Sequence, residues 1–387
     1  MADFAQRAQL LGLSPTANFA GIVTINSLDQ LKEILNLTPY SPTVDQVQGN
    51  NSDDHATLVG NAVAAQVYGT TPATDADNQL IQSAFPLRVY VVSQQDMTIS
   101  SQWNLTQPGG GPVIVSLGTL TVNDGGYITI ANQTLDFTVD TLIRNGNAQP
   151  PSGNGLFNIL GLTGDMGAIG STPAAPGQAQ NGSPGNCSSA GIAGASGGNG
   201  TVGAAGSTGG PGGPGGAGKP SLPATIRIMS AVQTQIPLSI LTQSGAGGNG
   251  GTGGTGARGG QGGNGGHGAT CGCTGSSGGS GAQGGAGGAG GSGGPGGNPT
   301  DASGSITVFV PSASVSQFVQ IKNPAPAGLG GAGGQGGQGG AGGSAGGGGK
   351  HNDGGSGGGT GGQGTPGVNG PSGSGTGQPA AIYIQPI

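Results

Sequence analysis

The stretch that decides the fold runs from Gly247 to Gly268 and reads GGNGGTGGTGARGGQGGNGGHG. Its three-residue phase never slips, and it matches the left-handed polyproline-II conformation, which has three residues per turn, a rise of about 3.1 Å and no internal hydrogen bonds. Backbone N–H and C=O groups still need partners, and a face without Cβ lets neighbouring backbones approach closely enough to supply them. The sequence therefore predicts a bundle of polyglycine-II helices, with third residues such as Asn249, Thr252 and Thr255 facing solvent or a gap between helices.

Two other structures have similar compositions. A flexible linker is also rich in glycine and serine, because ordering glycine costs more backbone entropy than ordering any other residue. A linker has no reason to keep the triplet phase, however, so the phase favours the ordered bundle. Collagen has one glycine in three and abundant proline. This chain often has two glycines in three and only 26 prolines in 387 residues, which disfavours collagen.

Composition and charge restrict the function. Hydrophobic residues make up 32% of the chain and aromatic residues 3%, against about 45–50% apolar residues in an ordinary globular domain, so we expect no large conventional core. The chain has 9 Lys and Arg against 15 Asp and Glu, a net charge of −6, and no basic stripe that would bind nucleic acid. No apolar run reaches the length of a membrane span, and the first residues lack the features of a signal peptide. We expect an extracellular or virion-surface protein without a recognisable signal peptide.

The chain divides into two expected domains, a mixed α/β domain at 1–150 and a glycine-rich domain at 151–387. Ser27 and Gln30 fit a helix capping box, which predicts a short helix at 28–36. Further helices are expected at 53–68 and 75–85. After residue 87, short β-branched runs punctuated by glycines predict a β-sandwich or a solenoid-like sheet. These runs lie at 87–92, 97–101, 113–122, 127–131 and 135–143.

Strand-like runs return between the glycine tracts, which makes an internal repeat. They lie at 224–229, 236–241, 305–310, 318–321 and 381–384. Each repeat is a strand pair, a glycine arm outward, a tip and a glycine arm back, with arm pairs at 161–218, 247–297 and 330–377. The expected fold is mainly β with polyglycine-II helices: a β-rich base carries three pairs of glycine-rich type II helices, and short α-helices lie near the N-terminus.

This arrangement resembles two families. It is similar to the N-terminal domain of Obg-type GTPases, whose glycine-rich loops form six type II helices that project from a β-structure. The GPGGAGK run at 213–219 is followed by Pro220 where a phosphate-binding loop needs Ser or Thr, so we expect no nucleotide and no other cofactor. Over about 160–377 the chain also resembles the receptor-binding adhesins at the tips of phage long tail fibres. That resemblance implies a polyglycine-II sandwich with variable tip loops.

The loops that interrupt the triplets are the candidate binding sites, because side chains reappear there. We expect these tip loops at 171–190, 270–277 and 348–353. Their candidate binding residues are Cys187, Thr270, Cys271, Cys273, Lys350, His351 and Asp353. Cys187 could form a disulfide with Cys271 or Cys273, or all three could be free thiols. A Cys/His metal site would require the three tips to converge, and the spacing of Cys271 and Cys273 is a weak signal for one, so no metal is predicted.

Catalysis has little support in the sequence. Beyond residue 150 the only acidic residues are Asp165, Asp301 and Asp353, which is too few for a cluster of tuned acids and bases. Our leading hypothesis is a non-enzymatic structural protein that self-associates. The alternative is a receptor-binding adhesin whose tip loops bind a surface glycan or protein. Ice binding is a third hypothesis, since Thr252 and Thr255 form a short regular row.

Overall fold

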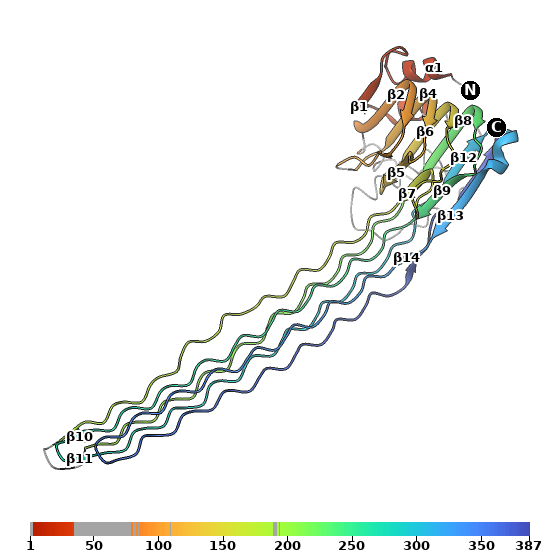
Figure 1. The fold of residues 1–387 in the computed structure, drawn as a ribbon. Helices are drawn as coiled ribbons and strands as arrows, with labels where there is room; N and C mark the ends of the chain where they lie inside the picture. The colour runs from red at the N-terminus through yellow and green to blue at the C-terminus, as the bar shows by residue number, and fades with distance from the viewer. Residues whose placement is uncertain are drawn as a thin grey trace.

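A computed structural model describes residues 3–34, 79, 83, 85–108, 110–188, 192 and 194–387. The molecule has a β-rich base and long glycine-rich segments that run side by side away from it (Figure 1). No helix among the described residues is long and apolar enough to cross a membrane. The expected β-rich fold with short helices near the N-terminus is confirmed at this level.

Two sheets build the base. The seven-stranded sheet has the order β1 (Phe19–Ile25), β2 (Leu87–Ile99), β4 (Val113–Val122), β6 (Leu135–Arg144), β8 (Ala224–Gln233), β12 (Ile306–Val310) and β16 (Ile382–Pro386). The five-stranded sheet has the order β13 (Phe318–Asn323), β9 (Leu238–Gln243), β7 (Phe157–Leu160), β5 (Tyr127–Ala131) and β3 (Gln102–Asn104). From β2 onward the chain alternates between the sheets, and neighbouring strands within each are parallel. The base is therefore a parallel β-solenoid, the second of the two arrangements that the sequence predicted.

The core lies between the two sheets. Phe137 of β6 packs edge-on against Phe157 of β7, with ring centroids 5.2 Å apart, and Trp103 of β3 also packs against Phe137, with ring centroids 6.3 Å apart. Leu117 and Ile240 are also fully buried here. The low apolar share of the whole chain thus reflects the glycine segments, while the base has an ordinary apolar core.

An N-terminal cap covers one end of the solenoid. It consists of α1 (Phe4–Leu10), α2 (Leu28–Ile34) and β1, which pairs with β2 in the antiparallel direction. The Arg7 guanidinium of α1 joins this cap to the seven-stranded sheet, because it donates to Asp140 Oδ1 of β6 at 2.7 Å and to Leu117 O of β4 at 2.8 Å. The helix expected at 28–36 is α2. The helix expected at 53–68, and nearly all of the one at 75–85, lie outside the described residues.

The glycine segments leave the solenoid at one corner of three successive coils. Each pair is inserted between a strand of the five-stranded sheet and the next strand of the seven-stranded sheet: β7 to β8, β9 to β12, and β13 to β16. We call them arm 1 (161–186), arm 2 (195–219), arm 3 (245–269), arm 4 (276–298), arm 5 (328–349) and arm 6 (354–374). Both sheets contain strands from either side of residue 150, so the expected domain boundary falls inside the solenoid.

Candidate functional site: the glycine arms and their tips

Arms that run in the same direction form one layer. In the outward layer, Gly167 N–H of arm 1 donates to Asn249 O of arm 3 at 2.8 Å, and Gly250 N–H of arm 3 donates to Leu329 O of arm 5 at 2.8 Å. The return layer repeats this pattern, since Gly209 N–H of arm 2 donates to Ala289 O of arm 4 at 2.9 Å. Such bonds recur every three residues, so one glycine of each triplet joins neighbours within a layer.

A second glycine of each triplet joins the two layers. Gly251 N–H of arm 3 donates to Gly213 O of arm 2 at 2.9 Å, and Gly294 N–H of arm 4 donates to Gly251 O at 2.8 Å. Gly331 N–H of arm 5 in turn donates to Gly294 O at 2.8 Å. The arms therefore form a two-layer slab in which arms 3 and 4 each contact four neighbours.

Close backbone approach explains the two glycines in each triplet. A Cβ added to Gly253 would overlap the carbonyl oxygen of Gly291 in arm 4, and one added to Gly254 would overlap the carbonyl oxygen of Ser171 in arm 1. The third position of the triplet, Thr255, is exposed. In most triplets two positions therefore carry no side chain, and the third carries one at the surface. Ala257 of arm 3 and Ala282 of arm 4 are exceptions that place a methyl group at the position joining the two layers.

These third positions create two different surfaces. The outward face is formed by arms 1, 3 and 5. It carries polar and charged side chains, among them Asn181, Asn249, Arg258, Gln261, His267, Gln335 and Gln338, and also the exposed apolar side chains of Met166, Ile169 and Leu329. The return face is formed by arms 2, 4 and 6. Between the base and the tip its third positions are Asn199, Val202, Ala205, Thr208, Pro211, Pro214, Ala217, Ser280, Gln283, Ala286, Ala289, Ser292, Pro295, Asn298, Ser356, Gly359, Gly362, Thr365, Val368, Pro371 and Ser374. The return face thus carries no charge over this length.

Side chains on the return face are in register across the arms. Gly215 N–H donates to Pro295 O at 2.9 Å and Gly296 N–H donates to Pro371 O at 2.9 Å, which aligns Pro214, Pro295 and Pro371 in one row. The adjacent row contains the exposed Val368. The return face is therefore a regular surface of small side chains with an apolar end near the base.

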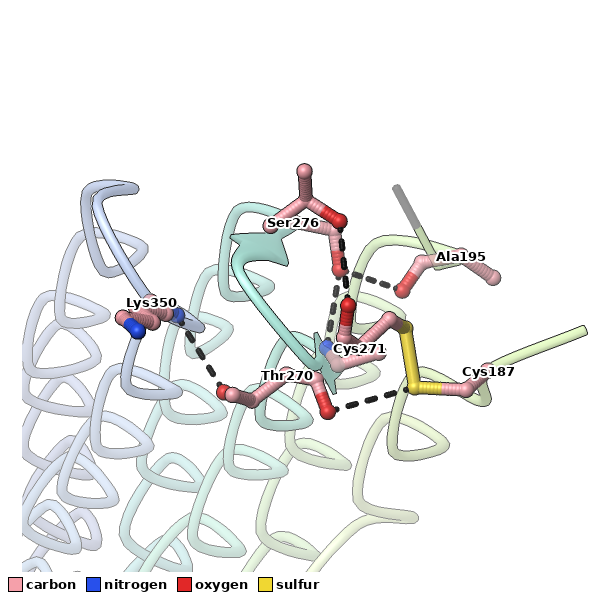
Figure 2. Close-up of a disulfide and its surroundings, with 8 residues drawn as sticks. Cys187, Ala195, Thr270, Cys271, Ser276 and Lys350 are labelled. Atoms are coloured by element: carbon pink, nitrogen blue, oxygen red, sulfur yellow. Dashed lines mark hydrogen bonds between the residues drawn. A yellow bond between two sulfur atoms is a disulfide. The ribbon is translucent and has the colours of Figure 1, made fainter. Parts of the chain in front are cut away.

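At the far end of the slab, a disulfide joins the first two tips (Figure 2). Cys187 bonds to Cys271, with Cα atoms 5.6 Å apart, and Cys273 is free and exposed. Cys187 Sγ also lies 3.3 Å from Thr270 O. Because a disulfide sulfur carries no hydrogen, this is a contact and not a hydrogen bond. Ser276 Oγ strengthens the junction by donating to Ala195 O at 2.6 Å and accepting from Ala269 N–H at 2.8 Å.

The third tip is attached to the second. Lys350 N–H donates to Thr270 Oγ1 at 3.2 Å, so the structure brings together candidate residues from all three tips. Lys350, His351 and Asp353 are exposed. Among the described residues, no three His, Cys, Asp or Glu side chains are grouped so that they could hold a metal ion.

The first tip is shorter than expected. We expected a loop over 171–190, but Ala179, Gly182 and Gly185 still donate N–H bonds to arm 3 at 2.7–2.8 Å. Proline and alanine are compatible with the extended arm conformation, and Ala179 bonds to arm 3 from a triplet position that is glycine at 182 and 185. The irregular composition of this segment therefore marks an arm at the edge of the slab.

The sequence did not identify the return face as a surface. Its rows join residues 81 and 76 positions apart, as in Pro214, Pro295 and Pro371, and those offsets depend on which arms are neighbours. The alignment of three prolines is a signal that could have been found once the two-layer order was known.

Comparisons with known proteins add little. No family model and no curated protein matches the chain. One solved structure has a weak likeness, a nine polyproline type II helical bundle antifreeze protein from the springtail Granisotoma rainieri. It is 24% identical over 54% of this chain and 93% of that chain, with a TM-score of 0.07. At that score the likeness carries no argument about fold or function.

Proposed function

We propose that this is a non-enzymatic structural protein whose arms are polyglycine-II helices. The support is the hydrogen-bond pattern between neighbouring arms, which repeats every three residues. The arms themselves contain neither α-helix nor β-strand. At a rise of about 3.1 Å per residue, arm 3 (245–269) would extend about 75 Å. Bonds to neighbours on several sides make such a slab stiff, which suits a spacer or a building block.

The slab self-associates through its return face. This proposal depends mainly on one observation: the face carries small, uncharged side chains in register on three arms. Seven rows at about 9 Å spacing and three arms at roughly 5 Å spacing give on the order of 950 Å² per copy. A stable protein interface uses about 800 Å² per partner, so the face is large enough. Absence of charge means that two such faces meet without repulsion or loss of charged-group hydration.

The test places a charge at the centre of each face. Ala286→Lys adds a lysine to arm 4 on the return face, and Thr255→Lys is the matched control on arm 3 of the outward face. Both positions are exposed third positions, so the slab should fold in both variants. We expect light scattering and electron microscopy to show assemblies for the native chain and Thr255→Lys, with at least tenfold weaker assembly for Ala286→Lys. A native chain that forms no side-by-side assemblies, or equal assembly of both variants, would refute this function.

A receptor-binding adhesin is the second candidate. The observation that favours it is the tip, where a disulfide and the Lys350–Thr270 bond hold three loops together and Lys350, His351 and Asp353 remain exposed. Replacing these three residues by alanine should abolish binding to a glycan array or cell surface and leave slab assembly intact. The disulfide also favours an oxidising location such as the cell exterior or a virion surface, which we include in the proposal.

A further inference from the structure

The two ends of the solenoid differ in how their last strands are covered. At the N-terminal end, β2 is paired with β1, and α1 and α2 pack nearby. At the other end, β16 pairs with β12 on one side and contacts the 3-10 helix η1 (Ser312–Gln317), and no strand among the described residues pairs with its other side. A strand with one unpaired side has free backbone N–H and C=O groups that can bind another strand.

The register of β16 identifies which backbone groups are free. Ile306 N–H of β12 donates to Ala381 O at 2.8 Å, and Ile387 N–H donates to Val310 O at 2.9 Å. The pairing is parallel, with Ile306 opposite Ile382. Because alternate residues of a strand bond to the same neighbour, the odd-numbered residues of β16 bond to β12. Ile382 and Ile384 therefore direct their N–H and C=O groups away from the sheet.

We propose that β16 pairs with β16 of a second copy of this chain, in the antiparallel direction. A two-fold axis at Tyr383 would place Ile382 of each copy opposite Ile384 of the other. Each of these two residue pairs would exchange two N–H to O=C bonds, so four main-chain hydrogen bonds would join the sheets. The two Tyr383 residues would form the closer, non-hydrogen-bonded pair between them, where aromatic side chains interact well across strands.

A second copy fits this edge because the edge is complementary to itself. β16 carries no charge, and its Tyr383 is 37% exposed, with Ile387 just beyond it at 38%. Pro386 has no N–H, and its position points outward, so it ends the pairing without interrupting the bonds at Ile382 and Ile384. The terminal strand of the other sheet, β13, carries an exposed Lys322, which disfavours pairing at that edge.

This dimer would have a distinctive shape. Arm 6 leads into the N-terminal end of β16, so antiparallel pairing sends the arms of the two copies in opposite directions. The particle would have a joined base at its centre and a slab at each end. Assembly through the return face instead places slabs side by side, so the two associations are distinguishable and either can fail without the other.

The test removes one outward N–H. Ile384→Pro eliminates the donor that faces the second copy, and it leaves the bonds of Tyr383 and Gln385 to β12 in place. Ile384→Val is the matched control. A second variant, Tyr383→Lys, places two like charges across the axis, with Tyr383→Phe as its control. Circular dichroism and thermal unfolding should show that all four variants fold like the native chain.

Sedimentation and electron microscopy then give the result. We expect the native chain and both controls to form two-ended dimers, and we expect Ile384→Pro and Tyr383→Lys to weaken dimer formation at least tenfold. A native chain that shows no two-ended particles at any concentration would overturn the proposal. Two-ended dimers that persist in both Ile384→Pro and Tyr383→Lys would also overturn it. The same holds for two-ended dimers that are lost in Ala286→Lys but kept in Ile384→Pro.

Discussion

A single methyl group at Gly253 should locally disrupt the slab. Gly253 lies in arm 3, and a Cβ there would overlap the carbonyl oxygen of Gly291 in arm 4. That oxygen accepts from Gly334 N–H at 2.8 Å, and Gly253 N–H itself donates to Ala332 O at 2.9 Å. The Gly253→Ala substitution must therefore push apart three arms at one point.

The cost follows from these contacts. Each net hydrogen bond contributes about 1 kcal/mol, and at least two or three are stretched or broken. Forcing extra atoms into a close-packed site costs a further 1–3 kcal/mol or so. Replacing glycine by alanine recovers only about 0.4–1 kcal/mol, because it restricts the unfolded chain. We expect a net loss of local stability of about 3 kcal/mol.

Gly362 of arm 6 provides the matched control. It lies at a third position, where an added Cβ meets no atom within 4 Å and the backbone φ is not in the positive range. Gly362→Ala should therefore be neutral or stabilise the chain by up to about 1 kcal/mol through the same unfolded-state effect.

Native-state hydrogen exchange measures both variants locally, since it reports the free energy of opening at individual amides. Gly253→Ala should speed exchange of the amides at position 253, Gly291 and Gly334 by roughly a hundredfold, which corresponds to about 3 kcal/mol. Equal exchange in Gly253→Ala and Gly362→Ala would refute the close-approach explanation for the two glycines of each triplet.

Three further outcomes concern the rest of the molecule. Phe137→Ala should destabilise the base by about 3–5 kcal/mol in chemical denaturation, because its ring is fully buried against Phe157. Cys271→Ser removes a disulfide between residues 84 positions apart. It should cost about 2–4 kcal/mol of stability measured without reductant, whereas Cys273→Ser should cost nothing measurable. Asp140→Ala should lower the unfolding free energy by about 2 kcal/mol, because it removes a partly buried carboxylate from the Arg7 guanidinium in the cap.

The sequence predicted most elements of this fold because they have local signals, but it did not predict α1, β1, β3 or β7. The β-branched run at 113–122 became β4, and the capping box at Ser27 became the start of α2, where Gln30 N–H donates to Ser27 Oγ at 3.2 Å. The three arm pairs follow from the three-residue spacing of glycine, which is present within a single arm. Local composition determines each of these elements with little help from distant residues.

The arrangement of those elements was harder to predict. Parallel pairing of β4 with β6 depends on the solenoid path, and the pairing of arm 3 with four other arms depends on contacts between residues about 80 positions apart. No pattern within one arm specifies its neighbours. The disulfide illustrates this limit, because the sequence left Cys187 with two potential partners and the register of arms 1 and 3 selects Cys271.

The side chains at the slab edges explain why the lattice ends at arms 1 and 6. In arm 3 the triplet position whose N–H bonds to arm 2 is occupied by Gly248, Gly251 and Gly254. The same triplet position in arm 1 carries the side chains of Asp165, Ala168 and Ser171. In arm 6, Thr360, Gln363 and Asn369 stand at the positions that in arm 4 are Gly284, Gly287 and Gly293.

A Cβ at any of those glycines would overlap a backbone oxygen of the next arm, so edges that carry side chains cannot accept another arm in the same lattice. Asn369 Oδ1 also accepts from Gly333 N–H at 2.9 Å, which satisfies a donor that would otherwise face outward. Lateral growth by repeating the lattice is therefore blocked on both sides. Any association of the slab must use its faces, its tip or its base, which is why the variants Ala286→Lys and Ile384→Pro together test the main routes to assembly.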